Sequence, residues 1–424
     1  MNHPEEFAGR EQLRASSSEF RREIVEVAGG VFAAIGYSAS NVVLIQTASS
    51  SIIIDTSANP VDAQDIVEAF GERFRRPVAA IIYTHNHPDH TGGATVFAGG
   101  DNPAIISHRI LVESGPEFAR GPRDGGDAFG TKLPEALFIN AGTQREYGRV
   151  TPHTRVGFLQ PTRLIDAEEE ELVIAGLRLH LVHAPGEAPE NIAVWLPNQR
   201  VLVPGDIVLK TFPNLSPIRG LKLRPPQVWI ASLNRLMRLD AEAMVQGHMR
   251  PVIGRTEVAR ALRDYRDGIE IVLDQTLDGI RRGRTPDELV ETVRLPKQLA
   301  DSPYLQEFYG NVAWAVRGIY ADYAGWFDGN ATNLHPLTPR ARGERMIALM
   351  GGVEALVRRA SDALTCGDFQ WAAELADHVI AATGSREATE IKADALSQLA
   401  ERQINATARN YYLTTAQYLR GQLS

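Results

Sequence analysis

A short polar run at residues 84–90, THNHPDH, holds three histidines and one aspartate. It follows the apolar run PVAAIIY, which predicts a buried strand that ends just before it. On an extended backbone alternate side chains point to the same side, so His85 and His87 project together, and Asp89 and His90 follow as the chain turns into TGG. Imidazole and carboxylate groups at this density are typical of a transition-metal site, and a polar loop with incidental histidines is the weaker interpretation.

The H-x-H-x-D-H run after a strand resembles the metallo-β-lactamase superfamily, whose αββα sandwich holds one or two metals at the ends of its strands. Three later motifs follow in the order that the resemblance implies. HAPGEAPEN carries Glu187 where the superfamily has a histidine ligand, VLVPGD carries Asp206 where a carboxylate bridges two metals, and MVQGH ends on His248. Glu190 is the alternative to Glu187.

The resemblance implies two metal positions with a shared carboxylate between them. The expected ligands are His85, His87 and Glu187 for one metal, Asp89, His90 and His248 for the other, and Asp206 as the bridge. His183 is expected either beside the ligands or as a strand-end residue, rather than among the ligands. No metal-like spacing is seen for His108, His153, His180, His335 and His378. Ligands without thiolate suit two Zn2+ ions per chain, with iron or manganese as alternatives, and such ions make activated water the expected nucleophile.

The chain resembles the alkylsulfatases, the zinc-dependent type III sulfatases, over roughly residues 30–415, and the glutamate in place of the third histidine ligand narrows the resemblance to this family. TFPNLSPIRG resembles that family's N-L-x-x-x-R-G segment, and GWFDGNATNLHPL resembles part of its dimerisation region. The implied site residues are Asp89 and Arg219 as catalytic residues, with Arg219, Asn214 and Tyr147 as substrate contacts. A guanidinium supplies the positive charge that a neutral metal shell lacks, and its fork matches an oxyanion. A surface arginine and ordinary packing of the tyrosine are the alternatives.

The resemblance therefore implies hydrolysis of a sulfate ester. Attack at sulfur and attack at carbon stay open, as do sulfamate, phosphodiester, lactone and β-lactam substrates and a metal-stabilised scaffold without catalysis. Two departures bear on the substrate. Asp206 stands where these sulfatases have a glutamate, and the sequence ends about where their apolar sterol-carrier-like domain would begin. A smaller or more polar sulfate than a detergent is expected.

The composition is that of a globular protein with an ample core. The 424 residues are 44% hydrophobic and 23% charged, which suggests two or three domains. The net charge of -8 offers no general basic surface, so no nucleic-acid partner is expected. The sequence shows neither a secretory leader nor an apolar window of about 20 residues, which predicts a cytoplasmic protein without membrane contact. Cys366 is the single cysteine; it excludes an internal disulfide and is expected to be buried.

The elements that must position the candidate ligands are of α/β type. SNVVLIQTASSSIIIDTS predicts two paired strands, VDAQDIVEAFGERFRR a helix, and TGGATVF the start of another helix. RLIDAEEEELVIAGLRLHLVHAP predicts a hairpin, with Asp166 and Glu168–Glu171 in a solvated turn. ENIAVWLPNQRVLVPGD predicts another strand pair with PNQR as its turn. The order of strands and helices fits the sandwich that the resemblance implies.

The pattern changes to helices after about residue 255. Thr285 is the expected N-cap of one helix, with Pro286 at its first position. We predict a catalytic domain at 1–255, a helical dimerisation region at 256–342 and a helical, vaguely tetratricopeptide-like region at 343–424. The apolar side chains of the middle region exceed what one sandwich face can bury, so a homodimer is expected. Cover by the C-terminal helices is the alternative.

Overall fold

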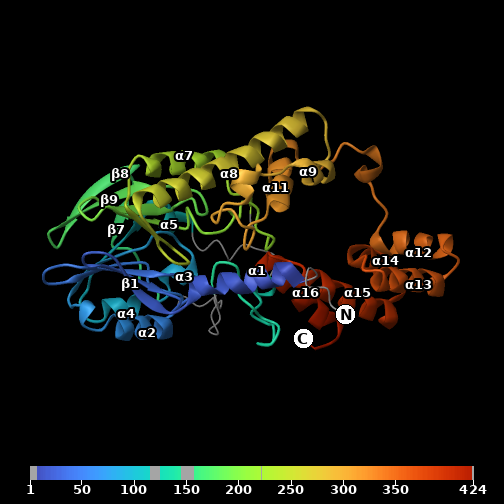
Figure 1. Ribbon diagram of the computed structural model, residues 1–424, viewed down its shortest axis with the longest axis horizontal. Coiled ribbons are helices and arrows are strands. Elements are labelled where there is room, and N and C mark those ends of the chain that lie inside the picture. The colour runs from blue at the N-terminus through green and yellow to red at the C-terminus, as the bar shows by residue number, and fades with distance from the viewer. Residues whose placement is uncertain (1–6, 115–124, 145–156, 221, 423–424) are drawn as a thin grey trace. The chain divides into compact units, whose positions relative to one another are not determined.

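Strands of two mixed sheets form the centre of the larger part of the chain (Figure 1). The computed structural model describes residues 7–114, 125–144, 157–220 and 222–422. The first sheet runs in the order β1 (Glu23–Ala28), β2 (Val31–Ile35), β3 (Val42–Gln46), β4 (Ser51–Ile54), β5 (Val78–Ile82), β6 (Ala104–His108) and β7 (Arg163–Ile165). The second runs in the order β13 (Val252–Ile253), β12 (Ala243–Gln246), β11 (Val201–Gly205), β10 (Ile192–Leu196), β9 (Leu177–His183) and β8 (Glu169–Ile174).

The predicted strand pairs are confirmed. β3 pairs antiparallel with β4, β8 with β9, and β10 with β11. From β4 to β7 the first sheet is parallel, which brings the carboxyl ends of these strands to one edge. The expectation that Glu168–Glu171 form a turn is wrong for most of the run, because Glu169, Glu170 and Glu171 lie in β8. β8 is an edge strand, and acidic side chains that alternate toward solvent are common at such an edge.

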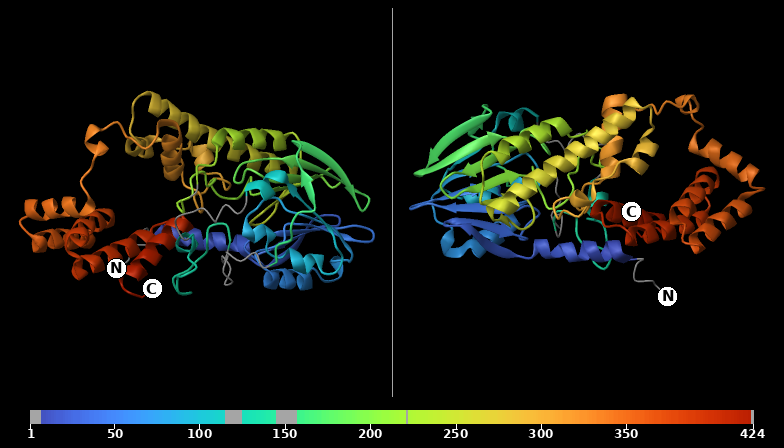
Figure 2. Two further views of the ribbon diagram at one scale, coloured as in Figure 1. Left: turned by 180° about the vertical axis from the view of Figure 1, so that it is seen from behind. Right: turned by 45° about the horizontal axis from the view of Figure 1, so that its top comes forward.

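The two sheets stack with helices on both outer faces, as Figure 2 shows. Val31, Ala33 and Ile35 of β2 point into the cluster between the sheets, while Phe32 and Ala34 join the cluster that also holds residues of α2 (Pro60–Phe70) and α4 (Ala94–Ala98). This alternation follows from the two-residue period of a strand. On the other side, α7 (Pro226–Met237) and α8 (Arg255–Arg281) cover the second sheet. The arrangement is the αββα sandwich expected from the sequence.

Shorter helices complete this part of the chain. They are α3 (Pro88–Thr91), α5 (Arg109–Ser114), α9 (Pro286–Thr292), α10 (Lys297–Ala300), α11 (Val312–Ala324) and the 3-10 turns at Ser17–Phe20 and Gly71–Arg73. The predicted cap of α9 is confirmed. The Thr285 side chain accepts the amide of Glu288, and the Glu288 carboxylate accepts the amide of Thr285 in return, with Pro286 at the helix start.

The chain divides into two units that do not follow chain order. The larger comprises residues 17–123 and 142–323, and the smaller comprises 1–16, 124–141 and 324–424. The domain boundaries expected near 255 and 342 stay a prediction.

The smaller unit is helical. Its described elements are α1 (Ala8–Ser16), α6 (Gly126–Phe129), a 3-10 turn (Ala331–Leu334), α12 (Pro339–Leu349), α13 (Val353–Thr365), α14 (Phe369–Thr383), α15 (Arg386–Glu401) and α16 (Ala406–Leu419).

Polar contacts join the three segments of the smaller unit. Arg10 donates to Glu401 at 2.7 Å, and the buried Asn410 side chain donates to the carbonyl of Asn140 at 3.1 Å. The expected burial of Cys366 is wrong: the residue is exposed in the turn between α13 and α14, where chain reversals lie at the surface.

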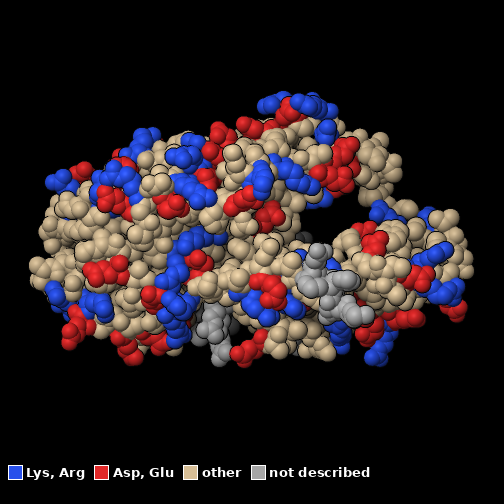
Figure 3. Space-filling model, in the orientation of Figure 1, with Lys and Arg blue, Asp and Glu red and all other residues tan. Residues whose placement is uncertain are grey.

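Charge is distributed without a dominant sign over the face seen in Figure 3, where basic and acidic side chains of the described residues are interspersed. Within the described ranges, none of the helices combines the length and the apolar character that a membrane crossing needs.

Candidate metal centre

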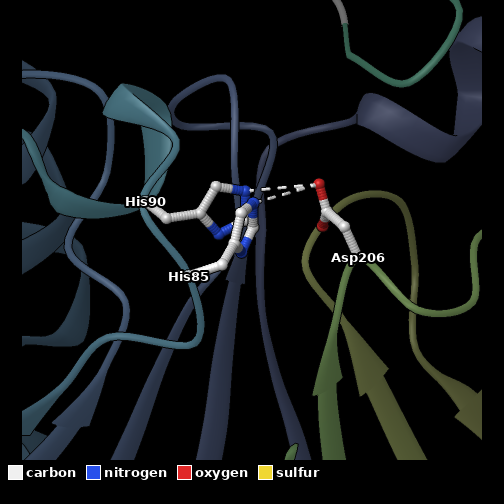
Figure 4. A group of neighbouring side chains, drawn as sticks. All are labelled: His85, His90 and Asp206. Atoms are coloured by element: carbon white, nitrogen blue, oxygen red, sulfur yellow. Dashed lines mark ion pairs between the residues drawn. The ribbon is translucent and has the colours of Figure 1, made fainter. Parts of the chain in front are cut away.

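The candidate ligands lie at strand ends of both sheets. His85 follows the end of β5 by three residues, Asp206 directly follows β11, and His248 follows β12 by two residues. Glu187 lies in the loop between β9 and β10. In Figure 4, His85 and His90 face Asp206 from the opposite side of the gap between the strand ends.

Three groups of described residues bring ligand atoms within 4.8 Å of one another. They are His85, His90 and Asp206; Asp89, His90 and His248; and His87, Glu187 and Asp206. Each of the seven predicted ligands belongs to a group, and Asp206 belongs to two. Asp89 and His248, which are 159 positions apart in the chain, are therefore close together in space. Their roles as ligands stay a prediction.

The spacing of the ligand atoms suits an ion between them. Asp206 Oδ2 lies 3.1 Å from Nε2 of His248, 3.6 Å from Nε2 of His90 and 3.7 Å from Nε2 of His85. Asp89 Oδ2 lies 3.6 Å from Nε2 of His248. Two ligands bound at about 2.0–2.1 Å to one tetrahedral ion lie roughly 3–4 Å apart, so these pairs have the separation that a shared ion requires.

The imidazole rings are oriented by hydrogen bonds on their far side. Nδ1 of His90 lies 2.8 Å from Asp55 Oδ2, Nδ1 of His85 lies 3.0 Å from Thr84 Oγ1, and Nδ1 of His248 lies 2.8 Å from the carbonyl of Ala39. With the Nδ1 proton donated to an oxygen, the Nε2 lone pair is left for a metal. Thr84 Oγ1 also donates to Asp55, so one carboxylate orients His85 indirectly and His90 directly.

Several buried atoms of the centre lack a hydrogen-bond partner. Within the described part of the chain these include Nε2 of His85, Nε2 of His90 and Oδ1 of Asp206. Buried polar atoms are rarely left unsatisfied, and a carboxylate and two imidazoles are the donor set that zinc takes. The residues present therefore fit a divalent metal.

The pKa shifts in the centre agree with that fit. Burial and the neighbouring His90 hold the pKa of His85 well below its usual value, so this ring is neutral at pH 7. Burial opposes a charge on His90, but Asp206, Asp55 and Asp89 raise its pKa well above the usual value. A site that attracts a proton so strongly between carboxylates also attracts a metal cation, which displaces the proton on binding.

The backbone at Gly247 passes unusually close to the ligands. A Cβ atom there would lie 2.0 Å from Oδ1 of Asp206 and 2.8 Å from Cε1 of His90. Only glycine leaves both side chains in place.

The loop between β2 and β3 fastens the ligand segments. Ser40 Oγ donates to the carbonyl of Asp89, and the Asn41 side chain donates to the carbonyls of Gln246 and Met249 on both sides of His248. Asn41 is buried, and its amide group satisfies backbone that the strand ends leave unpaired.

The residues predicted to contact substrate are placed as follows. Arg219 is buried, with Nη1 3.2 Å from the hydroxyl of Tyr309. Asn214 is buried five residues before it. Tyr147 lies outside the described residues. Glu190, the alternative ligand, is buried and accepts the amide of Asn86, and it appears in none of the three ligand groups of the described residues.

Two charged residues beside the centre were not singled out from the sequence. Asp55 follows β4 with a positive φ of 58°, a conformation that is uncommon for a non-glycine residue and that marks it once the backbone is known. Arg224 forms a buried ion pair with Glu187, Nη1 to Oε1, at 2.7 Å. No spacing rule in the sequence connects either residue to its partner.

Two known protein families match this chain, one in its N-terminal half and one in its C-terminal part. The metallo-β-lactamase superfamily matches residues 35–248, and the alkyl sulfatase dimerisation family matches residues 285–422. A linear primary-alkylsulfatase of Pseudomonas sp. is 36% identical over 395 residues, which are 90% of this chain and 74% of that protein. This chain belongs to the alkylsulfatase family of the metallo-β-lactamase superfamily.

This member of the alkylsulfatase family is also similar to a yeast sulfatase and to a solved sec-alkylsulfatase structure. The alkyl/aryl-sulfatase BDS1 of Saccharomyces cerevisiae is 30% identical over 420 residues, which are 94% of this chain and 64% of that protein. The structure of the stereoselective inverting sec-alkylsulfatase Pisa1 from Pseudomonas sp. matches with a TM-score of 0.86 at 27% identity, over 95% of this chain and 66% of that one. The chain spans between 61% and 74% of the length of its curated alkylsulfatase relatives.

Proposed function

We propose that this chain is a metal-dependent hydrolase of sulfate esters. The observation that carries the proposal is the convergence of buried imidazoles and carboxylates, with unsatisfied atoms facing one another, in a chain of the alkylsulfatase family. Curated relatives are a linear primary-alkylsulfatase and an alkyl/aryl-sulfatase, which supports an organic sulfate as the substrate.

The metal is proposed to be zinc, with two ions per chain, and iron or manganese are the alternatives. The residues that would hold the ions are His85, His87, Asp89, His90, Glu187, Asp206 and His248. When bound, such ions supply Lewis acidity, which lowers the pKa of water toward neutrality and polarises the ester oxygens. Elemental analysis of protein purified without added metal checks the proposal, with about two zinc ions per chain expected.

The protein's own groups are proposed to bind and orient the substrate. Arg219 presents a planar guanidinium that binds the sulfate oxygens, and its contact with Tyr309 holds the group in place. Asn214 and Tyr147 are the further proposed contacts. Asp89 is proposed as a catalytic residue, because its carboxylate lies 3.7 Å from Nε2 of His90 and 3.6 Å from Nε2 of His248. Its backbone carbonyl accepts a hydrogen bond from Ser40, which fixes this part of the chain.

A substrate panel tests the reaction. Short alkyl and aryl sulfates should release inorganic sulfate, measured by ion chromatography, whereas sulfamates, phosphodiesters, lactones and β-lactams serve as the competing classes. Release from none of the sulfates, together with turnover of another class, would replace the proposal. Hydrolysis in water labelled with heavy oxygen then assigns the broken bond: label in the alcohol means attack at carbon, and label in the sulfate means attack at sulfur.

Arg219→Ala tests the sulfate contact. Removal of a charge-assisted partner should weaken substrate binding by roughly 2–4 kcal/mol while the metal content is retained. Arg266→Ala is the matched control, because Arg266 lies on α8 and pairs with Asp267 rather than with a residue of the centre. If the Arg219 variant binds substrate as tightly as the wild-type protein, the residue does not belong to the site.

A homodimer is proposed for the assembly. The match to the alkyl sulfatase dimerisation family supports it, as does the segment 324–337 of the smaller unit, where Trp326 is 76% exposed. Residues 256–342 are the proposed dimerisation region. The cytoplasmic location expected from the sequence stays a prediction.

A further inference from the structure

A buried arginine contacts one of the candidate ligands. Arg224 is 4% exposed and Glu187 5%, and Nη1 of the arginine lies 2.7 Å from Oε1 of the glutamate. The same nitrogen donates to the carbonyl of Asn214 at 2.9 Å, and the Arg224 amide donates to the carbonyl of Leu215. The guanidinium is therefore held by the backbone of the segment that also carries Arg219.

Arg224 is closed off from solvent. Its Nε and Nη2 are both buried and, within the described residues, have no hydrogen-bond partner. The contacts that the structure gives its guanidinium are with Glu187 and with the carbonyl of Asn214. A buried cation with two unsatisfied N–H groups is costly, and the ion pair with Glu187 is the interaction that offsets that cost.

The ion pair between Arg224 and Glu187 changes the net charge of the candidate ligands. Three of the candidate ligands are carboxylates, Asp89, Glu187 and Asp206, whereas the others are imidazoles that bind metal in the neutral form. The contact with Arg224 cancels the charge of Glu187 and fixes one of its two oxygens. A carboxylate has a second oxygen, so its capacity as a ligand is kept.

We propose that Arg224 is the positioning residue of Glu187: it fixes the carboxylate in one orientation and makes the pair act as a neutral ligand. The inference rests on the proposed metal centre. In this role Arg224 acts through the carboxylate that it holds. Its contribution depends entirely on the glutamate, which gives the proposal a specific test.

The test is a double-mutant cycle of Arg224→Met and Glu187→His. Metal affinity is measured by competition with a chromophoric chelator, so the readout does not require turnover. In the wild-type background, Arg224→Met should weaken metal binding by about 10–100-fold, the usual effect of removing a group that orients a ligand. In the Glu187→His background the same substitution should change metal affinity by less than about threefold, because a neutral imidazole needs no counter-charge.

Two further variants separate positioning from general stability. Arg409→Met is the matched control: Arg409 is a buried arginine of the smaller unit that pairs with Glu401 at 3.0 Å. It should lower the unfolding temperature without changing metal affinity. Arg224→Lys keeps the charge and should recover part of the loss. Circular dichroism verifies that each variant is folded.

The outcomes discriminate sharply. Unchanged metal affinity in Arg224→Met, a gain in affinity, or an equal loss in both backgrounds would overturn the inference. If Arg224→Met does not fold when Glu187 is present, Arg224→Lys replaces it in the test. Arg224→Lys must then lower metal affinity in the protein with Glu187 and leave it unchanged in the Glu187→His protein. Coupling without sulfate release from any ester would refute the proposed reaction and leave the positioning role standing. Sulfate release without coupling between Arg224 and Glu187 would support the proposed reaction and refute the positioning role.

Discussion

Gly247→Ala is the smallest change that should disable the candidate centre. The added Cβ would lie 2.0 Å from Oδ1 of Asp206, whereas an ordinary contact begins at 3.4 Å. The carboxylate must therefore move by about 1.4 Å, and His90 must also give way, since its Cε1 would lie 2.8 Å from the new atom. Gly247 has no positive φ, so the backbone accepts alanine and the effect is confined to the ligands.

The size of the effect follows from that displacement. A misplacement of about 1 Å in an active site costs about 100-fold in rate, which corresponds to about 2.7 kcal/mol of transition-state free energy. Overpacking of a tight site destabilises a fold by about 1–3 kcal/mol. We therefore expect the catalytic efficiency to fall by about 100-fold or more, together with loss of bound metal and a modestly lower unfolding temperature.

The assay combines elemental analysis after gel filtration, sulfate release, and thermal unfolding by circular dichroism. Gly100→Ala is the control, because a Cβ at Gly100 meets nothing within 4 Å and its φ is not positive. If the Gly247 variant keeps its metal and a catalytic efficiency within threefold of the Gly100 variant, Asp206 does not hold the position that the structure gives it relative to the ion.

Four other outcomes are expected. Asp206→Ala should lose metal and activity together, while His378→Ala, on α14, should keep both. Asp55→Asn should weaken metal binding by about 10–100-fold in a chelator competition, because the carboxylate that orients His90 is lost. Burial and the neighbouring His183 lower the pKa of His108 from 6.5 to about 4. The folded state then binds fewer protons than the unfolded state between these pH values, so the free energy of unfolding should decrease as the pH falls from 6.5 toward 4. His108→Gln should flatten that decrease. Light scattering should give twice the chain mass of 46.5 kDa, and a mass equal to one chain would contradict the homodimer.

The strands and several helix ends could be predicted because their signals are local. The alternating and continuous apolar runs around residues 42–54 and 192–205 became antiparallel pairs, and Thr285 became the cap of α9. The acidic run at 169–171 and Cys366 were misjudged for a shared reason. A polar segment forms an edge strand only if another strand of the chain lies beside it. A thiol is buried only if other side chains of the chain pack over it. Both depend on residues far away in the sequence.

Some residues of the candidate site could likewise be predicted from the sequence, and others could not. Four potential ligands within six residues, from His85 to His90, identify themselves by spacing alone. Glu187 could be preferred to Glu190 only by resemblance, and in the structure Glu190 accepts a backbone amide instead. Asp55 and Arg224 have no such pattern. Their importance comes from contacts that exist only after the two sheets have stacked.

The assembly of the smaller unit from three segments has a consequence for the protein's synthesis on the ribosome. Asn140 and Asn410, which bond to each other, are 270 residues apart in the chain, and Arg10 and Glu401 are 391 apart. At a translation rate of about 5–20 residues per second, the 270 residues between the two asparagines take roughly 14–54 seconds to make. Helix α1 and residues 125–141 therefore remain without their α15 and α16 partners for most of translation, so the apolar side chains that they later bury in the smaller unit stay uncovered during this interval.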